Sequence, residues 1–268
     1  MSDRVSNSAE NTYAGLGSIL VVLPTYNEAE NIERTVTRLR KAVPGADLLV
    51  TDDASPDGTG QIADRLAAAD PHIHVLHRAA KDGLGTAYRE SFDWGLDRGY
   101  DVLCEMDADG SHQPEELVKL LQGLLGADLV IGSRWIPGGR VENWSHLREV
   151  LSRGANLYAR IALGVPLRDA TAGFRAFRRA TLEGIGLHDV ESLGYCFQID
   201  LAWRAYRAGY RVTEVPIVFL EREYGTSKMN LQVMTESLRR VTVWGLQHRL
   251  RQAREVTAGR RLASDRRR

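Results

Sequence analysis

Two aspartates separated by one residue, Asp107 and Asp109, are the residues of this sequence with the clearest chemical meaning. They follow Val102–Met106, an apolar run with the length of a buried strand. A strand ending there would fix the separation of two carboxylates that could share Mg²⁺ or Mn²⁺, whose remaining ligands would be water and phosphate oxygens. An isolated Asp-x-Asp is more often a solvated acidic turn, so the prediction depends on its surroundings. The nearby His112 could indicate a transition metal, although a lone histidine beside a turn is usually polar surface.

A second pair of carboxylates, Asp52 and Asp53, follows another apolar run, Asp47–Thr51. These side chains could accept hydrogen bonds from a nucleoside base or ribose. They could equally cap the turn at Ser55–Gly58, and we expect that role for at least one of them. The segment Pro24–Glu28 ends a third apolar run. Because the carboxyl ends of parallel strands meet at one edge of a sheet, the three acidic segments are expected to lie side by side.

The second half of the chain contributes basic side chains beside glycine or serine, a setting in which arginine and lysine could bind phosphate oxygens. These candidates are Arg134, Arg148, Arg175, Arg222 and Lys228. The glycine-rich run Lys81–Ala87 does not match a dinucleotide-binding motif, because Tyr88 stands where the third glycine belongs. A glycine-rich turn beside a nucleotide is the interpretation that remains for this run.

Apolar runs alternate with amphipathic segments, which predicts an α/β fold: a mostly parallel, Rossmann-like sheet with helices on both faces. The expected strands are Ser18–Leu23, Asp47–Thr51, Ile73–Leu76, Val102–Met106, Asp128–Ile131 and Val212–Phe219. Asn27 is expected to cap the first helix. Two C-terminal amphipathic stretches, Trp144–Val165 and Leu231–Leu250, complete a single domain over residues 18–250. Residues 1–17 are expected to be a disordered lead-in, and residues 251–268 a basic disordered tail.

The 35 basic and 35 acidic residues balance, but the charge is unevenly placed. From Arg249 onward there are eight arginines and two acidic residues, so a tail of charge +6 follows a body of charge −6. The neutral total argues against a general nucleic-acid binder. Cys104 and Cys196 lie in apolar segments and are expected to be buried thiols, outside any disulfide framework. Neither a secretory signal nor a run of ~20 apolar residues is found, which favours a cytoplasmic protein, soluble or peripheral.

Together these motifs resemble the inverting GT-A glycosyltransferases of family 2, and within them the dolichol- and polyprenol-phosphate mannose synthases. The combination is especially similar to the actinobacterial polyprenol-monophosphomannose synthases. The resemblance covers roughly residues 18–250, with the motifs in the same order. The matching segments are Pro24–Glu28, Asp52–Thr59, Asp107–His112, Gly132–Arg134, Asn143–Trp144 with Arg148 and Ser152, Asp169–Arg175, Gly194–Gln198 and Glu221–Lys228.

For the sugar donor, the resemblance implies GDP-mannose. Thr51 would contact its guanosine part through the backbone. The side chains implied to hold the guanosine are Pro24, Tyr26, Glu28 and Asp53.

The resemblance also implies a divalent cation, Mg²⁺ or Mn²⁺, on the donor diphosphate. Asp107 and Asp109 would ligate it, while Ala108 and Arg134 would contact the donor. Some relatives have a glutamine at the position of Ser111 that also approaches the metal. Whether Ser111 serves as a third protein ligand or is replaced by water therefore stays open.

For the acceptor, the resemblance implies a polyprenyl phosphate. The residues implied to meet the acceptor phosphate or the diphosphate, some of them catalytic, are Arg134, Arg148, Ser152, Arg222 and Lys228. A phosphate oxygen is already ionised near neutral pH, so no general base has to deprotonate it. Asp169 and Asp200 are then expected to be structural or to contact the sugar. In-line attack would invert the α-linked donor to a β-mannosyl phosphate.

A lipid acceptor requires contact with a membrane. Trp144–Val165 and Leu231–Leu250 could lie at the inner face of the cell membrane, or could simply pack on the sheet. The basic tail would add attraction to anionic lipid, or would only be a solubilising end. An integral-membrane partner is a further possibility that the sequence leaves open.

Three other functions were weighed against this interpretation. A transferase using a UDP-sugar keeps the fold, but such relatives typically carry C-terminal membrane spans. A sugar-phosphate nucleotidyltransferase would need a glycine-rich phosphate loop after the first strand, and Pro24–Asn27 is not one. A non-catalytic sugar-nucleotide-binding or scaffold subunit is disfavoured because every charged motif position is filled.

Overall fold

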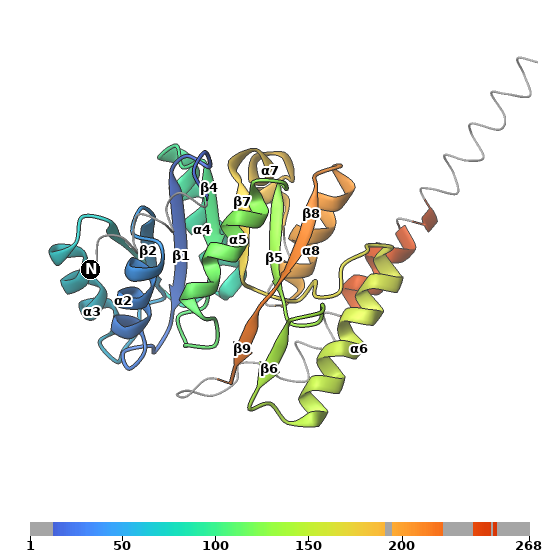
Figure 1. The fold of residues 1–268 in the computed structure, drawn as a ribbon, viewed down its shortest axis with the longest axis horizontal. Coiled ribbons are helices and arrows are strands. Elements are labelled where there is room, and N and C mark those ends of the chain that lie inside the picture. Colours follow the sequence, from blue (N-terminus) through green and yellow to red (C-terminus); the bar gives the residue numbers. More distant parts are fainter. Residues whose placement is uncertain (1–12, 191–194, 222–237, 248, 251–268) are drawn as a thin grey trace, which may run out of the picture.

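The computed structural model describes residues 13–190, 195–221, 238–247 and 249–250, which form an α/β fold (Figure 1). The strands are β1 (Ile19–Thr25), β2 (Asp47–Asp52), β3 (Ile73–His77), β4 (Val102–Glu105), β5 (Leu129–Ser133), β6 (Arg140–Glu142), β7 (Arg175–Arg178), β8 (Val212–Pro216) and β9 (Val218–Leu220). The helices are α2 (Ile32–Ala42), α3 (Thr59–Ala69), α4 (Leu84–Asp97), η1 (Pro114–Glu116), α5 (Leu117–Leu124), α6 (His146–Leu163), α7 (Arg179–Gly184), η2 (Leu187–Asp189) and α8 (Tyr195–Arg207).

Seven strands form the main sheet, in the order β3-β2-β1-β4-β7-β5-β8, and β6 pairs with β9 in a second small sheet. The sheet is mostly parallel, as the alternation of strands and helices predicts. β7 is the exception, because it runs antiparallel between β4 and β5. The sequence reading did not identify β7, whose four residues Arg175–Arg178 include two arginines and lack a strand-like apolar pattern.

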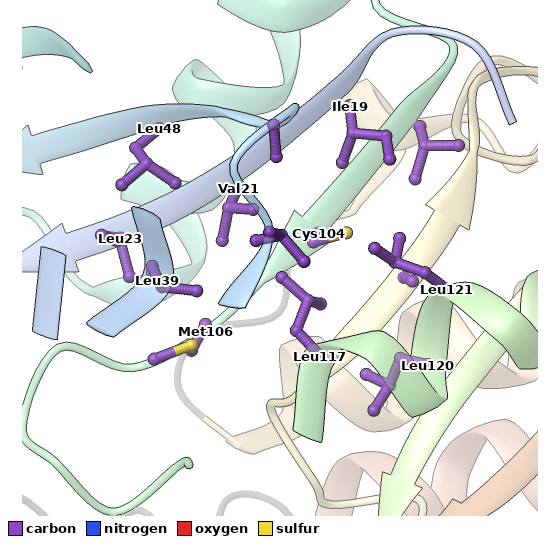
Figure 2. Close-up of a cluster of buried hydrophobic side chains, with 14 of the residues drawn as sticks. Ile19, Val21, Leu23, Leu39, Leu48, Cys104, Met106, Leu117, Leu120 and Leu121 are labelled. Carbon is purple, nitrogen blue, oxygen red and sulfur yellow. The ribbon is translucent and has the colours of Figure 1, made fainter. Parts of the chain in front are cut away.

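Both faces of the main sheet are buried, each in its own hydrophobic cluster. Figure 2 shows one of them, in which Ile19, Val21 and Leu23 of β1 point toward side chains of α2 and α5. The alternate residues Leu20 and Val22 lie in the other cluster. Burying an aliphatic side chain of this kind stabilises the fold by about 1.5–3 kcal/mol. A strand that is apolar at every position is therefore held from both sides, which fixes where its carboxyl end lies.

Three predicted boundaries are wrong. The first helix begins at Ile32, not near Asn27, which has a φ of 58° at the end of β1. The single strand expected over Val212–Phe219 is two strands in different sheets, because Pro216 has no N–H with which to continue the ladder. The predicted lead-in also reaches too far, since Tyr13 and Leu16 are buried in the core. Residues 1–12 and the tail at 251–268 lie outside the described residues.

Cys104 and Cys196 are both buried thiols that form no disulfide, as predicted. Burial raises the pKa of the Cys104 thiol well above its usual value, so it stays protonated. Over the part of the chain that the structure describes, no helix combines the length and hydropathy that a membrane crossing requires.

Candidate active site

The carboxyl ends of β1, β2 and β4 lie side by side, and the acidic segments meet there. Thr25 pairs with Asp52 across β1 and β2, and Val22 pairs with Glu105 across β1 and β4. Asp107 follows Glu105 by two residues. The juxtaposition predicted from the strand order is therefore confirmed, and it results from the parallel register.

The loop that carries Asp107 and Asp109 is held in place from several sides. The Asp107 N–H donates to Nδ1 of His112 (3.0 Å), and Oγ1 of Thr35 on α2 donates to the carbonyl of Ala108 (3.2 Å). Gly110 carries a positive φ of 80°, which glycine adopts without strain. The backbone at Asp107 and Ala108 is thus held by one side chain of the same loop and one of α2.

Asp109 is held by the residue that was considered as a third metal ligand. Oδ1 of Asp109 accepts hydrogen bonds from the backbone N–H of Ser111 (3.0 Å) and from its hydroxyl (2.6 Å). In this arrangement the Ser111 hydroxyl orients a carboxylate. Ser111 as a direct ligand stays a prediction, because a hydroxyl that donates its proton to Asp109 keeps its oxygen lone pairs.

His112 is not the surface histidine that its sequence context suggested. It is 1% exposed, with its ring stacked on Phe174 (centroids 4.9 Å apart) and in edge contact with Phe219 (5.3 Å). Burial lowers the pKa of His112 to about 4, so the ring is neutral at physiological pH. Because Nδ1 accepts the Asp107 N–H, the ring proton is on Nε2, and Nδ1 is already used in a hydrogen bond to the loop.

The two carboxylates after β2 have different roles. Asp52 caps the turn, since its carboxylate accepts from the backbone N–H (3.2 Å) and hydroxyl (2.5 Å) of Ser55. Asp53 instead forms a buried ion pair with Arg78, whose guanidinium also bonds Glu90 on α4 (Nε–Oε2 2.9 Å). Burial raises the pKa of Asp53, an effect that Arg78 opposes. The expectation that one of the pair caps the turn is confirmed.

Arg78 is a residue that the sequence reading missed. It directly follows β3, the next strand along the sheet, and that position after an apolar run was the only available signal. Nearby, the ammonium of Lys81 lies 3.7 Å from the centre of the Tyr26 ring, so the Lys81–Ala87 turn does flank the candidate nucleoside site. Tyr26, Asp53, Arg78 and Lys81 therefore form one cluster.

The remaining candidates on the nucleoside side are held by their neighbours. Glu28 is nearly buried and accepts a hydrogen bond from Nδ2 of Asn31 (2.9 Å), while its backbone N–H donates to Oγ1 of Thr59 (2.9 Å). The Thr51 hydroxyl bonds that of Ser91 on α4 (2.6 Å), so the side chain of Thr51 is already engaged inside the protein. Pro24 is half-buried and pairs with Thr51 in the sheet.

Two arginines proposed for phosphate binding are engaged inside the protein. Arg134 forms a bidentate ion pair with the fully buried Asp169 (Nε–Oδ2 2.8 Å, Nη2–Oδ1 2.6 Å). Arg175 is fully buried and donates to the carbonyls of Ala170, Ala172 and Gln198 (2.7 Å each). The prediction that Arg175 binds phosphate is therefore wrong, because every edge of its guanidinium faces the protein interior. For Arg134, contact with a ligand stays a prediction.

An aromatic cluster of Trp135, Trp144 and Phe219 adjoins the Asp107–Gln113 loop through the contact between Phe219 and His112. Arg134 lies 5.4–5.5 Å from the centre of all three rings.

The acceptor candidates of α6 lie against this cluster. Arg148 stacks on Trp144 (4.0 Å) and pairs with Glu221, and Ser152 follows one turn later on α6. The structure thus brings Arg134 and Arg148 to the same cluster. Arg222 and Lys228 lie outside the described residues.

Glu105 is a second residue that the sequence reading missed. Its carboxyl group is completely buried at the end of β4, close to the buried side chain of Gln198. Burial raises the pKa of Glu105 to about 8, while nearby Arg175 opposes the shift. A neutral carboxyl under the loop adds no negative charge beneath Asp107 and Asp109.

The family of this chain was identified by comparing its sequence with models of protein families. The family model described as glycosyl transferase family 2 matches residues 20–186. This chain belongs to that family. It is 57% identical over 239 residues to a polyprenol monophosphomannose synthase from Mycolicibacterium smegmatis, covering 88% of this chain and 90% of that protein. It is also 57% identical over 228 residues to an undecaprenyl-phosphate mannosyltransferase from Micrococcus luteus, covering 85% and 94%.

Solved structures of low sequence identity share the fold of this family 2 glycosyl transferase. One is a glucosyl-3-phosphoglycerate synthase from Mycobacterium tuberculosis with Mn²⁺, UDP and glucosyl-3-phosphoglycerate (TM-score 0.63, 23% identity, 91% of this chain and 83% of that one). Another is a mannosyltransferase from Pyrobaculum calidifontis with GDP-Man and Mn²⁺ (TM-score 0.57, 18% identity, 93% and 72%). At these identities the likeness establishes the fold alone.

The donor set of this glycosyl transferase fits a hard divalent cation. Within the described ranges, no three His, Cys, Asp or Glu side chains converge into a closed metal site. Asp107 and Asp109 offer oxygen ligands on a loop whose backbone is already fixed. Such a pair suits Mg²⁺ or Mn²⁺, which commonly take a few protein carboxylates and complete their coordination with water and substrate phosphates.

Proposed function

We propose that this glycosyl transferase moves mannose from GDP-mannose to a polyprenyl phosphate with inversion, giving a lipid-linked β-mannosyl phosphate. One observation supports the arrangement of both substrates: the loop of Asp107 and Asp109 lies between the nucleoside cluster around Asp53 and the arginine-bearing aromatic cluster around Trp144. The names of the two relatives that are 57% identical support the substrates themselves.

In the proposed mechanism, Asp107 and Asp109 hold Mg²⁺ or Mn²⁺, which when bound would stabilise the negative charge of the departing diphosphate. The nucleoside cluster orients the donor, with Tyr26, Glu28 and Asp53 toward the guanosine. Arg148 offsets the repulsion between the donor diphosphate and the acceptor phosphate. We assign the same role to Arg222 and Lys228, which lie outside the described residues. Catalysis then comes from positioning and charge stabilisation, because the phosphate nucleophile is already ionised.

The partners of Asp169 and Asp200 support a mechanism without a general base. Asp169 is fully engaged with Arg134, Asn156 and Thr171. Asp200 is buried and bonds Arg204 one turn later on α8 (2.8 Å). Both carboxylates therefore already bind a guanidinium, as expected of structural residues.

Replacing Asp200 with asparagine tests this mechanism. We expect Asp200→Asn to retain at least about a tenth of wild-type turnover, whereas loss of a general base typically lowers the rate by about 10²–10⁴-fold. Turnover is measured as transfer of labelled mannose to a short polyprenyl phosphate. A drop of more than about a hundredfold, with unchanged melting temperature and GDP affinity, would show that the reaction does use a base.

A donor comparison tests the proposed function as a whole. The purified protein is incubated with Mg²⁺ or Mn²⁺, a short polyprenyl phosphate and either labelled GDP-mannose or labelled UDP-glucose. We expect an acid-labile mannolipid, stable to mild alkali, from GDP-mannose only. Product from UDP-glucose would favour the UDP-sugar alternative, and nucleotide-sugar binding without product would favour a non-catalytic subunit.

We further propose that the protein attaches to the inner face of the cell membrane through an apolar patch on α6 and the helical residues 238–247 and 249–250. α6 buries Asn156, Ala159 and Leu163, and it lies at the end of the molecule opposite α3 (Figure 1). The patch consists of Leu147, Val150, Leu151, Leu157, Ile161, Val243, Leu246 and Leu250, each 42–70% exposed. Exposed Arg153 and Arg160 accompany it on α6, a pattern typical of interfacial helices.

Membrane attachment is expected to depend on this patch. Because two large aliphatic side chains lose their burial in lipid, the double variant Leu157→Ser/Ile161→Ser should partition into anionic vesicles at least about tenfold less than wild type. Co-sedimentation with phosphatidylglycerol-containing vesicles measures this, and GDP affinity should not change. Leu125→Ser is the matched control, because Leu125 is equally exposed (47%) outside the patch. Equal sedimentation of all three proteins would exclude the patch as the attachment site.

A further inference from the structure

The loop of Asp107–Gln113 is fixed by tertiary contacts that involve residues outside the aspartate pair. Backbone groups of the loop bond His112 at the first aspartate, Thr35 at Ala108 and the Gln113 side chain at Gly110 (3.1 Å). On the far side, the N–H of Leu220 donates to the carbonyl of Ser111 (3.0 Å). The backbone that carries the two carboxylates is therefore held from α2 and β9 as well as from within the loop.

His112 makes the contact nearest to the first carboxylate. Its Nδ1 accepts the backbone N–H of Asp107 at 3.0 Å, across a turn of five residues. The ring is 1% exposed and is fixed by Phe174 and Phe219, so it can neither rotate freely nor exchange its partner for water. Without an acceptor at this point, the buried N–H would be left unsatisfied or the loop would change conformation, and either outcome is unfavourable.

Thr35 provides a second and independent support. It is buried on the inner face of α2, and its hydroxyl donates to the carbonyl of Ala108, the residue between the two aspartates (3.2 Å). That bond turns the carbonyl toward α2. The N–H of Asp107 and the carbonyl of Ala108 are therefore each held by a side chain, one from the same loop and one from α2.

We infer that His112 and Thr35 are positioning residues that hold the Asp107–Asp109 loop in a cation-binding conformation before substrate arrives. His112 does so as a hydrogen-bond acceptor, not as a metal ligand, and Thr35 does so as a donor. This inference rests on the proposed function, because it assumes that the two aspartates bind a divalent cation. Outer supports of metal ligands typically contribute about 10–100-fold to metal affinity.

The test measures Mn²⁺ binding to the full chain by electron paramagnetic resonance, with and without GDP. His112→Phe keeps a ring between Phe174 and Phe219 but removes the acceptor, and we expect it to weaken Mn²⁺ binding by about 10–100-fold. His112→Asn places an amide oxygen near the position of Nδ1, so it should restore affinity to within a few-fold of wild type. His74→Phe is the control for replacing a ring, because His74 contacts Trp94 away from the loop.

Thr35→Val is the second variant, since it removes the hydroxyl with almost no change in volume. We expect weaker Mn²⁺ binding and faster hydrogen exchange at the loop amides, with the melting temperature within a few degrees of wild type. Unchanged affinity in both His112→Phe and Thr35→Val, or equal loss in His112→Phe and His112→Asn, would overturn the inference. If the wild-type protein binds no Mn²⁺ even with GDP, the proposed metal-dependent function fails, and the inference fails with it.

Discussion

Replacing either Asp107 or Asp109 with asparagine is expected to lower mannosyl transfer by roughly three orders of magnitude, which corresponds to about 4 kcal/mol. The amide keeps the size of the side chain but removes its charge, so the cation that would stabilise the departing diphosphate is bound weakly. Asp109 has the added role of accepting two hydrogen bonds from Ser111 (3.0 and 2.6 Å), which an amide oxygen can still accept. The loss should therefore come from the chemistry and not from unfolding.

Turnover at saturating Mn²⁺ and the Mn²⁺ affinity of each variant measure this effect together. Asp64→Asn is the matched control, because Asp64 on α3 is an exposed carboxylate that pairs with His77 at the end of β3. It should leave both quantities unchanged. Activity within about tenfold of wild type in both loop variants would contradict the assignment of the aspartate pair as the metal site.

Replacing Asp169 with alanine is expected to lower the free energy of unfolding by about 3–5 kcal/mol. The carboxylate is fully buried and accepts from the side chain and backbone N–H of Arg134 (2.6–2.9 Å) and from Nδ2 of Asn156 (3.3 Å). Its own backbone N–H donates to Glu214. Removal would leave the guanidinium of Arg134, which is 7% exposed, as a buried charge without its main partner.

Urea unfolding followed by circular dichroism measures this change. Glu149→Ala is the control, because Glu149 pairs with the exposed Arg153 on the surface of α6 (2.9 Å), and such pairs contribute at most about 1 kcal/mol. A loss for Asp169→Ala as small as that of the control would contradict the structural role given to this ion pair.

Much of the architecture could be predicted from local pattern. The apolar runs locate β1 to β5 to within two residues at each end. Repeated alternation implies a parallel sheet, and a parallel sheet places the ends of β1, β2 and β4 together. β7 could not be predicted, because its four residues are too few to show a periodic pattern. Its antiparallel pairing is with β4 and β5, which are distant from it in the sequence.

The individual roles of charged residues depend on partners that are distant in the sequence. Asp52 and Asp53 are adjacent, yet one bonds Ser55 three residues away and the other bonds Arg78, 25 residues away. Arg134 and Arg175 stand in similar glycine-containing contexts. Arg175 is directed inward to three carbonyls, which excludes it from phosphate binding. Sequence spacing does not distinguish such pairs, because it does not report which side chains share a buried space.

What the sequence by itself determined is the chemistry available: paired carboxylates after buried strands, in the motif order of a family 2 glycosyl transferase. Only the tertiary structure decided which of these groups are engaged inside the protein and which support the loop of the two aspartates. His112, Ser111 and Thr35 became supports of the aspartate loop, and one face of α6 stayed exposed. The physical reason is that hydrogen bonds and burial depend on three-dimensional proximity, which for these residues is set by the packing of the strands and helices that carry them.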